Sequence, residues 1–511
     1  MQQESRVKKS LLNARVNLIF YFLTLALSFF SRKTFLDCLG DEFIGLTGTV
    51  GNILGFLNLA ESGVSAAIAV VLYAPLYESN QQKIKEIVSV LGYLYHTIGK
   101  IILCGGLIVA CFFPLIFPDS ELGLPIIYFT FVSFLGSALI GYFINYKQVL
   151  LSADQRNYVV AAYSQSANVI KILLQMALAY YTRNCVLWVI VEFSFGILYS
   201  FILNWKIKQV YPWLVTEIKK GKTLCREYPD VMRYTKQLFI HKIGSVAYTQ
   251  VTPFLVYAFA SLQAVAYYGN YTLVTSKLSS LLFNFLGGTN ASVGNLIAEG
   301  NKDKILKVYW ELMSIRFLFV SGAVFAMYHL LPPFITLWLG EEYVMSQALL
   351  VLVLISFTLS IIRGVTDEFL QGYGLFKDIW APFVEAVILI VVAIIGGYLW
   401  GLEGTLLGSI VSSIIIIYIW KPYFLFNKGL HESVGIYWKE LAKYLLAFAL
   451  AFYIADIILA NLPIQLSYFT NLIDWILYAV ILVALFIPAV TFFLFLTTRG
   501  TRNLCYRLIK R

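Results

Sequence analysis

One carboxylate stands out because it lies inside an apolar stretch among polar neighbours. Glu61 follows Asn58 and precedes Ser62 in the string Phe-Leu-Asn-Leu-Ala-Glu-Ser-Gly. An ionised side chain that faces hydrocarbon costs roughly 2.5 to 3.5 kcal/mol on insertion scales. We therefore expect Glu61 either to face a wet interior, as in a transporter, or to make a helix-packing hydrogen bond to a neighbouring Asn or Ser.

The composition is that of an integral membrane protein. Of the 511 residues, 59% are hydrophobic and 13% are charged, and the mean hydropathy is +0.77, whereas soluble domains are about 45 to 50% apolar and about 25% charged. Apolar stretches of about 20 residues, the length that crosses a bilayer, recur about fourteen times. They cover 12–31, 44–73, 88–116, 124–151, 157–181, 185–204, 233–258, 264–297, 306–330, 345–372, 378–399, 403–425, 438–460 and 471–498. The sequence thus predicts an all-α polytopic membrane protein of about fourteen transmembrane helices.

Lysine and arginine residues are distributed unevenly between the two sides of the predicted spans. The side of the N-terminus carries most of them, including the segment 206–236 and the tail 499–511, while the other side keeps little more than Arg32, Lys33 and Arg183. By the positive-inside rule, both termini are cytoplasmic. The net charge of +10 therefore reflects membrane orientation, and we expect no binding of nucleic acid.

Two predicted inner loops resemble each other, which suggests an internal repeat. Glu78 opens Glu-Ser-Asn-Gln-Gln-Lys-Ile-Lys and Glu299 opens Glu-Gly-Asn-Lys-Asp-Lys-Ile-Leu, each after the second span of a six-span group. We expect two parallel halves related by an axis along the membrane normal, the alternative being a chance match of short polar turns. The predicted domains are a first bundle at 1–204, a linker at 205–232, a second bundle at 233–428, and two further helices with a basic tail at 429–511.

The linker at 205–232 combines many lysines with Trp213 and other apolar residues. This composition is typical of a segment that lies at the membrane surface against anionic lipid. Membrane lipids are therefore expected partners.

The other charges within spans are expected to face a wet interior or to pair with one another. Lys242 and Lys277 are candidates to line a cavity, although Arg15 and Lys242 can instead reach the inner headgroups. Arg363 either lines the cavity or pairs with Asp367 one helical turn away. In the first two helices of each half the cations face only the carboxylate of Glu61, which favours an anionic substrate.

The chain lacks the sequence signals of several other chemistries. Its six cysteines show no CxxC spacing and its four histidines are scattered, so we expect no metal site and no disulfide framework. The sequence has no GxxxxGK[ST] phosphate loop and no loop long enough for a nucleotide-binding domain. We expect no cofactor, and coupling to H⁺ or Na⁺ stays an open alternative.

Short strings along nearly the whole chain carry a family resemblance. They are Ser31-Arg32 with Leu39-Gly40 and Ile44-Gly45-Leu46, Asn58-Leu59-Ala60-Glu61-Ser62-Gly63, Leu72-Tyr73-Ala74-Pro75-Leu76-Tyr77, Asn145-Tyr146-Lys147 with Leu151-Ser152-Ala153-Asp154-Gln155, Tyr268-Gly269-Asn270-Tyr271, Ser292-Val293-Gly294-Asn295-Leu296 and Leu337-Trp338-Leu339-Gly340. In this order they resemble the bacterial polysaccharide biosynthesis proteins of the multidrug/oligosaccharidyl-lipid/polysaccharide (MOP) superfamily, specifically the O-antigen or capsule-type flippases. The Glu-Ser-Gly triplet departs from the more usual Glu-Leu-Gly.

This resemblance implies two six-helix bundles in a V around a cationic central cavity, with two further helices. It implies a substrate of undecaprenyl-pyrophosphate-linked oligosaccharide, moved to the outer leaflet of the bacterial inner membrane by alternating access. A polysaccharide polymerase and glycosyltransferases are the protein partners that it suggests. The cavity-lining residues that it implies, with Arg363 added from the charges within spans, are Arg15, Arg32, Asn52, Glu61, Lys242, Asn270, Lys277 and Arg363.

Two other functions remain as alternatives. A cation-coupled drug or small-molecule antiporter of the same fold would be expected to have a cavity of carboxylates and aromatic side chains. A membrane polysaccharide polymerase or ligase would be expected to carry a large outer loop with catalytic Arg or His, whereas the predicted outer loops are short. We therefore expect a transporter and not an enzyme.

Overall fold

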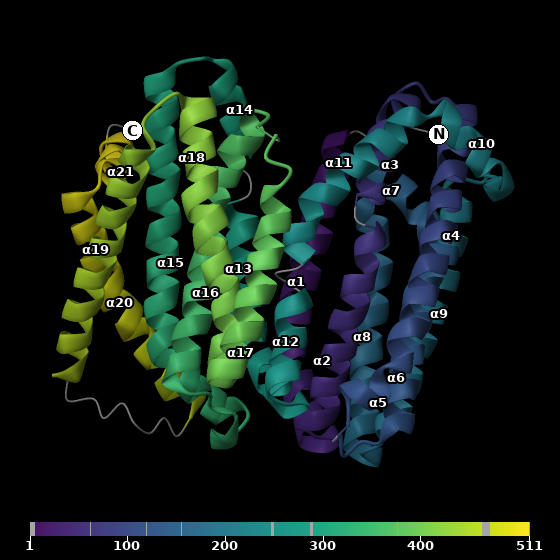
Figure 1. Ribbon diagram of the computed structural model, residues 1–511, viewed down its shortest axis with the longest axis horizontal. Coiled ribbons are helices and arrows are strands. Elements are labelled where there is room, and N and C mark those ends of the chain that lie inside the picture. Colours follow the sequence, from purple (N-terminus) through teal and green to yellow (C-terminus); the bar gives the residue numbers. More distant parts are fainter. Residues whose placement is uncertain are drawn as a thin grey trace. The chain divides into compact units, whose positions relative to one another are not determined.

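The computed structural model describes residues 6–61, 63–118, 120–154, 156–246, 250–286, 290–375, 377–461 and 471–509. These residues form helices and contain no strand, which confirms the predicted all-α class. The chain divides into two compact units (Figure 1), unit 1 at Met1–Ala266 and unit 2 at Tyr267–Arg511.

Unit 1 is built mainly from long helices. Its elements are α1 (Arg6–Leu39), α2 (Asp41–Leu57), the 3-10 turn η1 (Asn58–Glu61), α3 (Val64–Tyr77), α4 (Gln81–Cys111), α5 (Phe113–Ile116), α6 (Leu124–Phe143), η2 (Asn145–Lys147), α7 (Gln148–Ala153), α8 (Asn157–Thr182), α9 (Cys185–Val210), η3 (Ile218–Lys220), α10 (Gly221–Glu227), α11 (Pro229–Val246) and α12 (Thr252–Phe259). Helix α13 (Leu262–Leu286) starts in unit 1 and continues in unit 2.

Unit 2 contains the remaining helices and ends in a short amphipathic helix. Its elements are α14 (Asn290–Ala298), α15 (Lys302–Trp338), η6 (Glu341–Tyr343), α16 (Gln347–Gly372), α17 (Ala381–Ser413), η7 (Ile414–Trp420), α18 (Lys421–Leu425), η8 (Phe426–Leu430), α19 (Val434–Ala460), α20 (Leu472–Thr497) and α21 (Arg499–Ile509). Helices α19 and α20 pack against each other, and α20 packs on α15 (Figure 1).

The protein is a multi-pass membrane protein. Within the described ranges, nine helices are long and apolar enough to cross a bilayer. The fourteen predicted spans each overlap helical structure, but some are interrupted. The span at 44–73 is broken between α2 and α3. The spans at 378–399 and 403–425 lie on two separate limbs, because the backbone within α17 is non-helical at Trp400 and Gly401.

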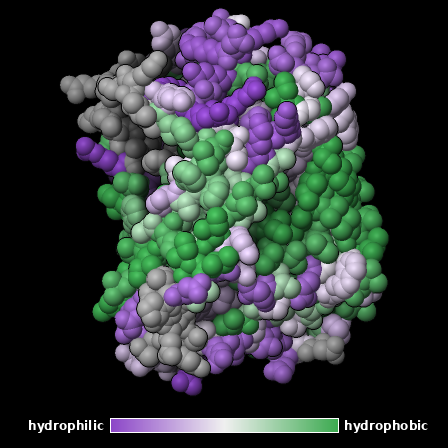
Figure 2. All heavy atoms as spheres, turned by 90° about the vertical axis from the view of Figure 1, so that its left-hand side faces the viewer, coloured by the Kyte–Doolittle hydropathy of each residue, from purple (hydrophilic) through white to green (hydrophobic). Residues whose placement is uncertain are grey.

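The surface of unit 2 shows the same membrane character. On the side that carries α19 and α20, an apolar band lies between hydrophilic zones at both ends (Figure 2). Exposed apolar side chains on these helices include Leu446, Tyr453 and Leu477. A soluble monomer rarely exposes so continuous an apolar surface, so we infer that this band faces lipid.

The boundary between the two units lies later in the chain than the predicted linker between the two bundles. The segment 205–232, predicted to separate the two bundles, lies within unit 1. Helix α11 packs on α3 and α12 packs on α2, so both belong to unit 1 by their contacts. The composition changes at the charged segment, whereas the boundary drawn from contacts follows Ala266.

The reversal of the chain within α17 depends on glycines. Gly401 has a φ of +59°, which favours glycine because a Cβ is strained there. A Cβ on Gly404 would lie 1.9 Å from the carbonyl oxygen of Gly396, so the two limbs of the helical hairpin cross with their backbones in contact. Small residues permit such close crossing in membrane proteins.

We expect Gly404→Ala to destabilise the protein by about 1 to 3 kcal/mol, because the limbs must separate to admit a methyl group. Gly294→Ala is the matched control, since a Cβ there meets nothing within 4 Å. Thermal unfolding of both variants in detergent checks the expectation. Equal melting temperatures would contradict the close crossing.

Candidate functional site

A polar cavity in unit 1 begins at the break in the second predicted span. Helix α2 ends at Leu57, the 3-10 turn η1 follows, and α3 begins at Val64. Gly63 precedes α3 with a left-handed φ of 100°, which glycine adopts without steric cost. Interrupted helices within a membrane are tolerated where they are buried in protein or line a cavity, and they often form binding sites.

Glu61, the last residue of η1, is held by hydroxyl groups from three helices. Its Oε1 accepts hydrogen bonds from Ser65 Oγ of α3 at 2.6 Å and from Tyr95 OH of α4 at 2.5 Å. The hydroxyl of Tyr142 on α6 lies 3.4 Å from Glu61 Oε2 and 2.9 Å from Oδ1 of Asn58. Oε1 therefore has two hydroxyl donors, and the single proton of Tyr142 is shared between Asn58 Oδ1 and the more distant Oε2. No Lys or Arg among the described side chains forms an ion pair with Glu61.

These groups line a cavity of about 600 Å³ between α3, α4, α6, α7 and α8. The described lining side chains include one carboxylate, several amides and hydroxyls, and no cation; they are Asn58, Glu61, Ser65, Ala66, Ala69, Tyr95, Ala138, Gly141, Tyr142, Gln148, Val149, Ser152, Asn157 and Val160. The cavity can therefore exchange hydrogen bonds with a polar ligand or hold a positively charged one.

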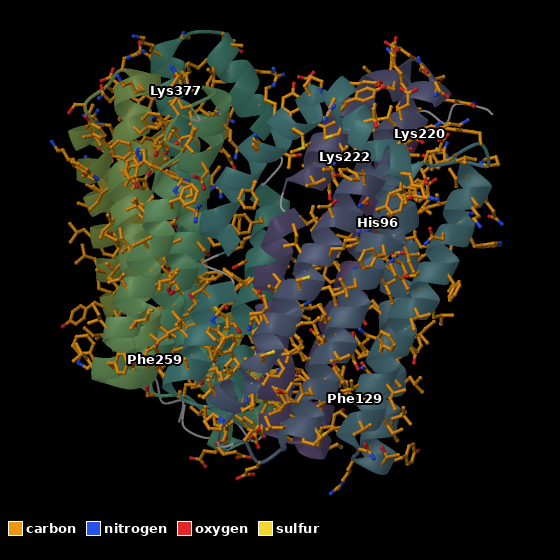
Figure 3. All side chains as sticks on the ribbon, turned by 45° about the vertical axis from the view of Figure 1, so that its right-hand side comes forward. His96, Phe129, Lys220, Lys222, Phe259 and Lys377 are labelled. Atoms are coloured by element: carbon orange, nitrogen blue, oxygen red, sulfur yellow. The ribbon has the colours of Figure 1, made fainter. Side chains whose placement is uncertain are left out.

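The level of the cavity within unit 1 can be followed in Figure 3. His96 is next to Tyr95 on α4, and it lies between the end that carries Lys220 and Lys222 and the end that carries Phe129. Tyr95, one of the lining residues, thus lies at a level between the two ends of unit 1, while the lining also extends to α7 and to the first residue of α8.

The other predicted site residues of unit 1 whose side chains are described do not line this cavity. Arg15 is exposed on α1, and Arg32 on the same helix donates a hydrogen bond from Nη2 to the carbonyl oxygen of Ala266 at 2.7 Å. Asn52 is half-buried on α2, and Lys242 belongs to α11, with its side chain outside the described residues. Of the four candidates in unit 1 whose side chains are described, only Glu61 is a lining residue.

The predicted site residues of unit 2 have different surroundings. Asn270 on α13 is fully buried, and Lys277 on the same helix is half-buried. Arg363 on α16 forms an ion pair with Asp367, with Nε 3.0 Å from Oδ2, and Lys421 Nζ lies 2.7 Å from the other oxygen of that carboxylate. The alternative that Arg363 pairs one helical turn away is therefore confirmed.

Sequence reasoning missed most of the groups that surround Glu61. Tyr95 and Tyr142 lie 34 and 81 residues away along the chain, and tyrosines in membrane spans are usually attributed to interface belts. Ser65 follows Glu61 by one helical turn, so the i to i+4 spacing was the one local signal available.

Comparisons with known proteins agree on the fold. No protein-family model matches the chain, and no curated protein matches it in sequence. A solved structure of the lipid II flippase MurJ in an inward closed conformation is similar, with a TM-score of 0.63, 16% identity, and coverage of 96% of this chain and 99% of that one. The chain has the fold of the MOP superfamily.

Two further structures with this fold are transporters by description. An inward-facing multidrug resistance MATE family transporter of the MOP superfamily gives a TM-score of 0.61 at 15% identity, covering 82% of this chain and 99% of that one. A MOP superfamily transporter from Pyrococcus furiosus, whose binding pocket is described as having reverse polarity, gives a TM-score of 0.53 at 14% identity. This match covers 83% of this chain and 97% of that one. The MOP-type fold inferred from sequence is thus confirmed.

The ion network around Asp367 predicts a structural role for Arg363. We expect Asp367→Asn to lower the free energy of unfolding by about 1 to 3 kcal/mol, because it leaves two cations without their shared carboxylate. Adding Lys421→Gln to this variant should recover part of the loss, which thermal unfolding can measure as a double-mutant cycle. Asp303→Asn, at an exposed residue in the first turn of α15, is the control. Additive effects of Asp367→Asn and Lys421→Gln would argue against the network.

Proposed function

We propose that the protein is a flippase that moves an undecaprenyl-pyrophosphate-linked oligosaccharide from the cytoplasmic to the outer leaflet of the bacterial inner membrane. It would do so by alternating access of its polar interior, without covalent chemistry and with both termini in the cytoplasm. The substrate class is carried over from the resemblance in sequence. The observation that carries the proposal is that the lipid II flippase matches more of the chain than the MATE transporter does.

We assign the additional matched part of the chain to helices α19 and α20 by its size. The match to the lipid II flippase takes in 96% of the chain and the match to the MATE transporter 82%. The difference of fourteen percentage points in 511 residues is about 70 residues, which is similar in size to the segment 434–497 that holds α19 and α20. A chain of this length corresponds better to the flippase than to the antiporter.

The cavity of unit 1 supports transport of a glycan headgroup. Sugar hydroxyls need hydrogen-bond partners that hydrocarbon cannot supply, and Glu61, Asn58 and the cavity amides offer them. In this proposal Arg15, Arg32 and Lys277 remain candidate contacts for the pyrophosphate. An inside-negative potential favours outward movement of negative charge by roughly 2.3 kcal/mol per charge per 100 mV, and coupling to H⁺ or Na⁺ would be an additional driving force.

A specific observation also favours a second candidate, a cation-coupled antiporter. The described cavity lining combines one carboxylate with two tyrosines and contains no Lys or Arg. This is the composition expected for binding of an organic cation. The two functions therefore need an experiment that separates them.

We expect Glu61→Gln to slow transfer of a fluorescent undecaprenyl-pyrophosphate oligosaccharide across proteoliposome membranes by about 10-fold or more, because a charge-assisted hydrogen bond contributes about 1.5 to 3 kcal/mol. Tyr142→Phe should slow transfer less, by about 3- to 10-fold, because it removes one neutral donor. The assay compares initial rates with and without an imposed inside-negative potential.

Tyr128→Phe is the matched control for Tyr142→Phe. Tyr128 is also on α6, but its hydroxyl donates to the carbonyl oxygen of Ala110 at 3.1 Å and lies outside the cavity. Its rate should equal that of the wild type. Absence of transfer with several glycans, together with efflux of an organic cation driven by H⁺ or Na⁺, would reject the flippase in favour of the antiporter.

A further inference from the structure

The segment 205–228, which we call the basic platform, is fixed to unit 1 by side chains on other elements. Thr216 Oγ1 lies 2.9 Å from the hydroxyl of Tyr146 in η2. The backbone amide of Glu217 donates to Ser89 Oγ of α4 at 3.0 Å. These contacts hold the middle of the platform against the end of the helical bundle, so its backbone has a defined position.

Two more contacts fix the second half of the platform. Gly221 lies on α4 so closely that a Cβ there would be 2.4 Å from Cβ of Tyr93 and 2.7 Å from the carbonyl oxygen of Ser89. The hydroxyl of Tyr228 donates to Glu86 Oε2 at 2.7 Å. Burial, together with the hydrogen bond to Glu86 and its charge, raises the pKa of Tyr228, so the phenol keeps the proton that this bond requires.

The platform presents more positive charge than its own carboxylates can neutralise. It contains six Lys and Arg residues and two Glu residues, a net charge of +4. Lys220 forms an ion pair with Glu217 at 2.6 Å, whereas Lys219, Lys222 and Arg226 are exposed and form no ion pair with any described residue. Figure 3 shows Lys220 and Lys222 at one end of unit 1, the end that the distribution of Lys and Arg assigns to the cytoplasm.

Apolar side chains are exposed on the same segment. Val215 is 67% exposed and Trp205 is 58% exposed, and Trp213 is half-buried with its ring 5.9 Å from that of Tyr211. Cations beside exposed aromatic and aliphatic side chains are typical of a surface at the boundary between headgroups and acyl chains. A nucleic acid offers no apolar surface comparable to acyl chains for Val215 and Trp205.

We propose that the basic platform is a preformed binding surface for the phosphate headgroups of anionic phospholipids. Lys219, Lys222 and Arg226 supply the positive charge, and Val215 and Trp205 contact the first part of the acyl chains. Because the backbone is already fixed, lipid binding orders few additional groups, which favours affinity. This binding is separate from the proposed flippase activity and does not depend on it.

The test measures binding of phosphatidylglycerol to the full-length protein in neutral detergent micelles, by native mass spectrometry, with phosphatidylcholine as the uncharged reference. The wild type should bind phosphatidylglycerol more tightly than phosphatidylcholine. Each cation near a membrane surface contributes about fivefold in affinity. The triple variant Lys219→Gln, Lys222→Gln, Arg226→Gln should therefore bind phosphatidylglycerol about 100-fold more weakly, while its melting temperature without lipid should stay unchanged.

The matched control removes the same charge from predicted inner segments of unit 2, as Lys302→Gln, Lys307→Gln, Lys377→Gln. These three side chains are exposed, and their loss should change the affinity less than about twofold if binding is local. An equal loss of affinity in both triple variants would mean that only the net charge of the protein matters, and it would overturn the proposal. Equal affinity of the wild type for the two lipids would overturn it as well.

A second variant separates geometry from charge. Gly221→Val keeps every cation but forces the platform away from Tyr93 and Ser89. It should weaken phosphatidylglycerol binding if the fixed backbone matters. Undiminished binding by a folded Gly221→Val protein would overturn the preformed surface.

Discussion

Hydrocarbon offers no hydrogen bonds, so each charge within a membrane span has to find its partner in the protein. Both units meet this constraint mainly with pairs between neighbouring helices. Lys171 on α8 lies 2.7 Å from Glu192 on α9, and the buried Arg316 on α15 pairs with Glu368 on α16. Breaking such a pair leaves an uncompensated charge. The pairs therefore specify which faces of adjacent helices meet, and the rest of the packing follows from that choice.

Glu61 meets the same constraint differently. Its partners are neutral hydroxyls, and its carboxylate opens onto a cavity instead of a cation. A carboxylate that is already neutralised by Lys or Arg has little left to offer a ligand. One that is held by hydroxyls keeps its charge available for a donor or a cation, because hydroxyl donors can be exchanged one at a time. The break between α2 and α3 is what places Glu61 at this point in the bundle.

The sequence could predict what depends on local pattern. Span length and polarity indicated the helices, and the Asn, Glu and Ser residues at 58–62 indicated a polar position inside a span. The partners Tyr95 and Tyr142 come from other helices, so no local signal distinguishes them from interface tyrosines. The same limit applies to the ion network around Asp367. Its ion pair with Arg363 follows from their spacing, but the second cation that pairs with Asp367 is Lys421, which lies 54 residues further along the chain. The contacts of α11 and α12 also lay beyond sequence reasoning, because they join these helices to α3 and α2, which are far away along the chain.

Two features of the molecule favour different functions, and the chemistry of the cavity can reconcile them. The extent of the fold, with α19 and α20, favours the flippase, whereas one carboxylate among tyrosines suits an organic cation. A glycan, however, presents hydroxyl groups to the same carboxylate. Replacing the hydroxyl of Tyr95 or Tyr142 by a sugar hydroxyl exchanges one neutral donor for another of similar strength, so it costs little and leaves the charge satisfied. A sugar hydroxyl and an organic cation both have to lose hydration before they reach Glu61. On this argument the cavity is compatible with a glycan headgroup as well as with a cation, so its composition does not contradict the proposed lipid-linked substrate.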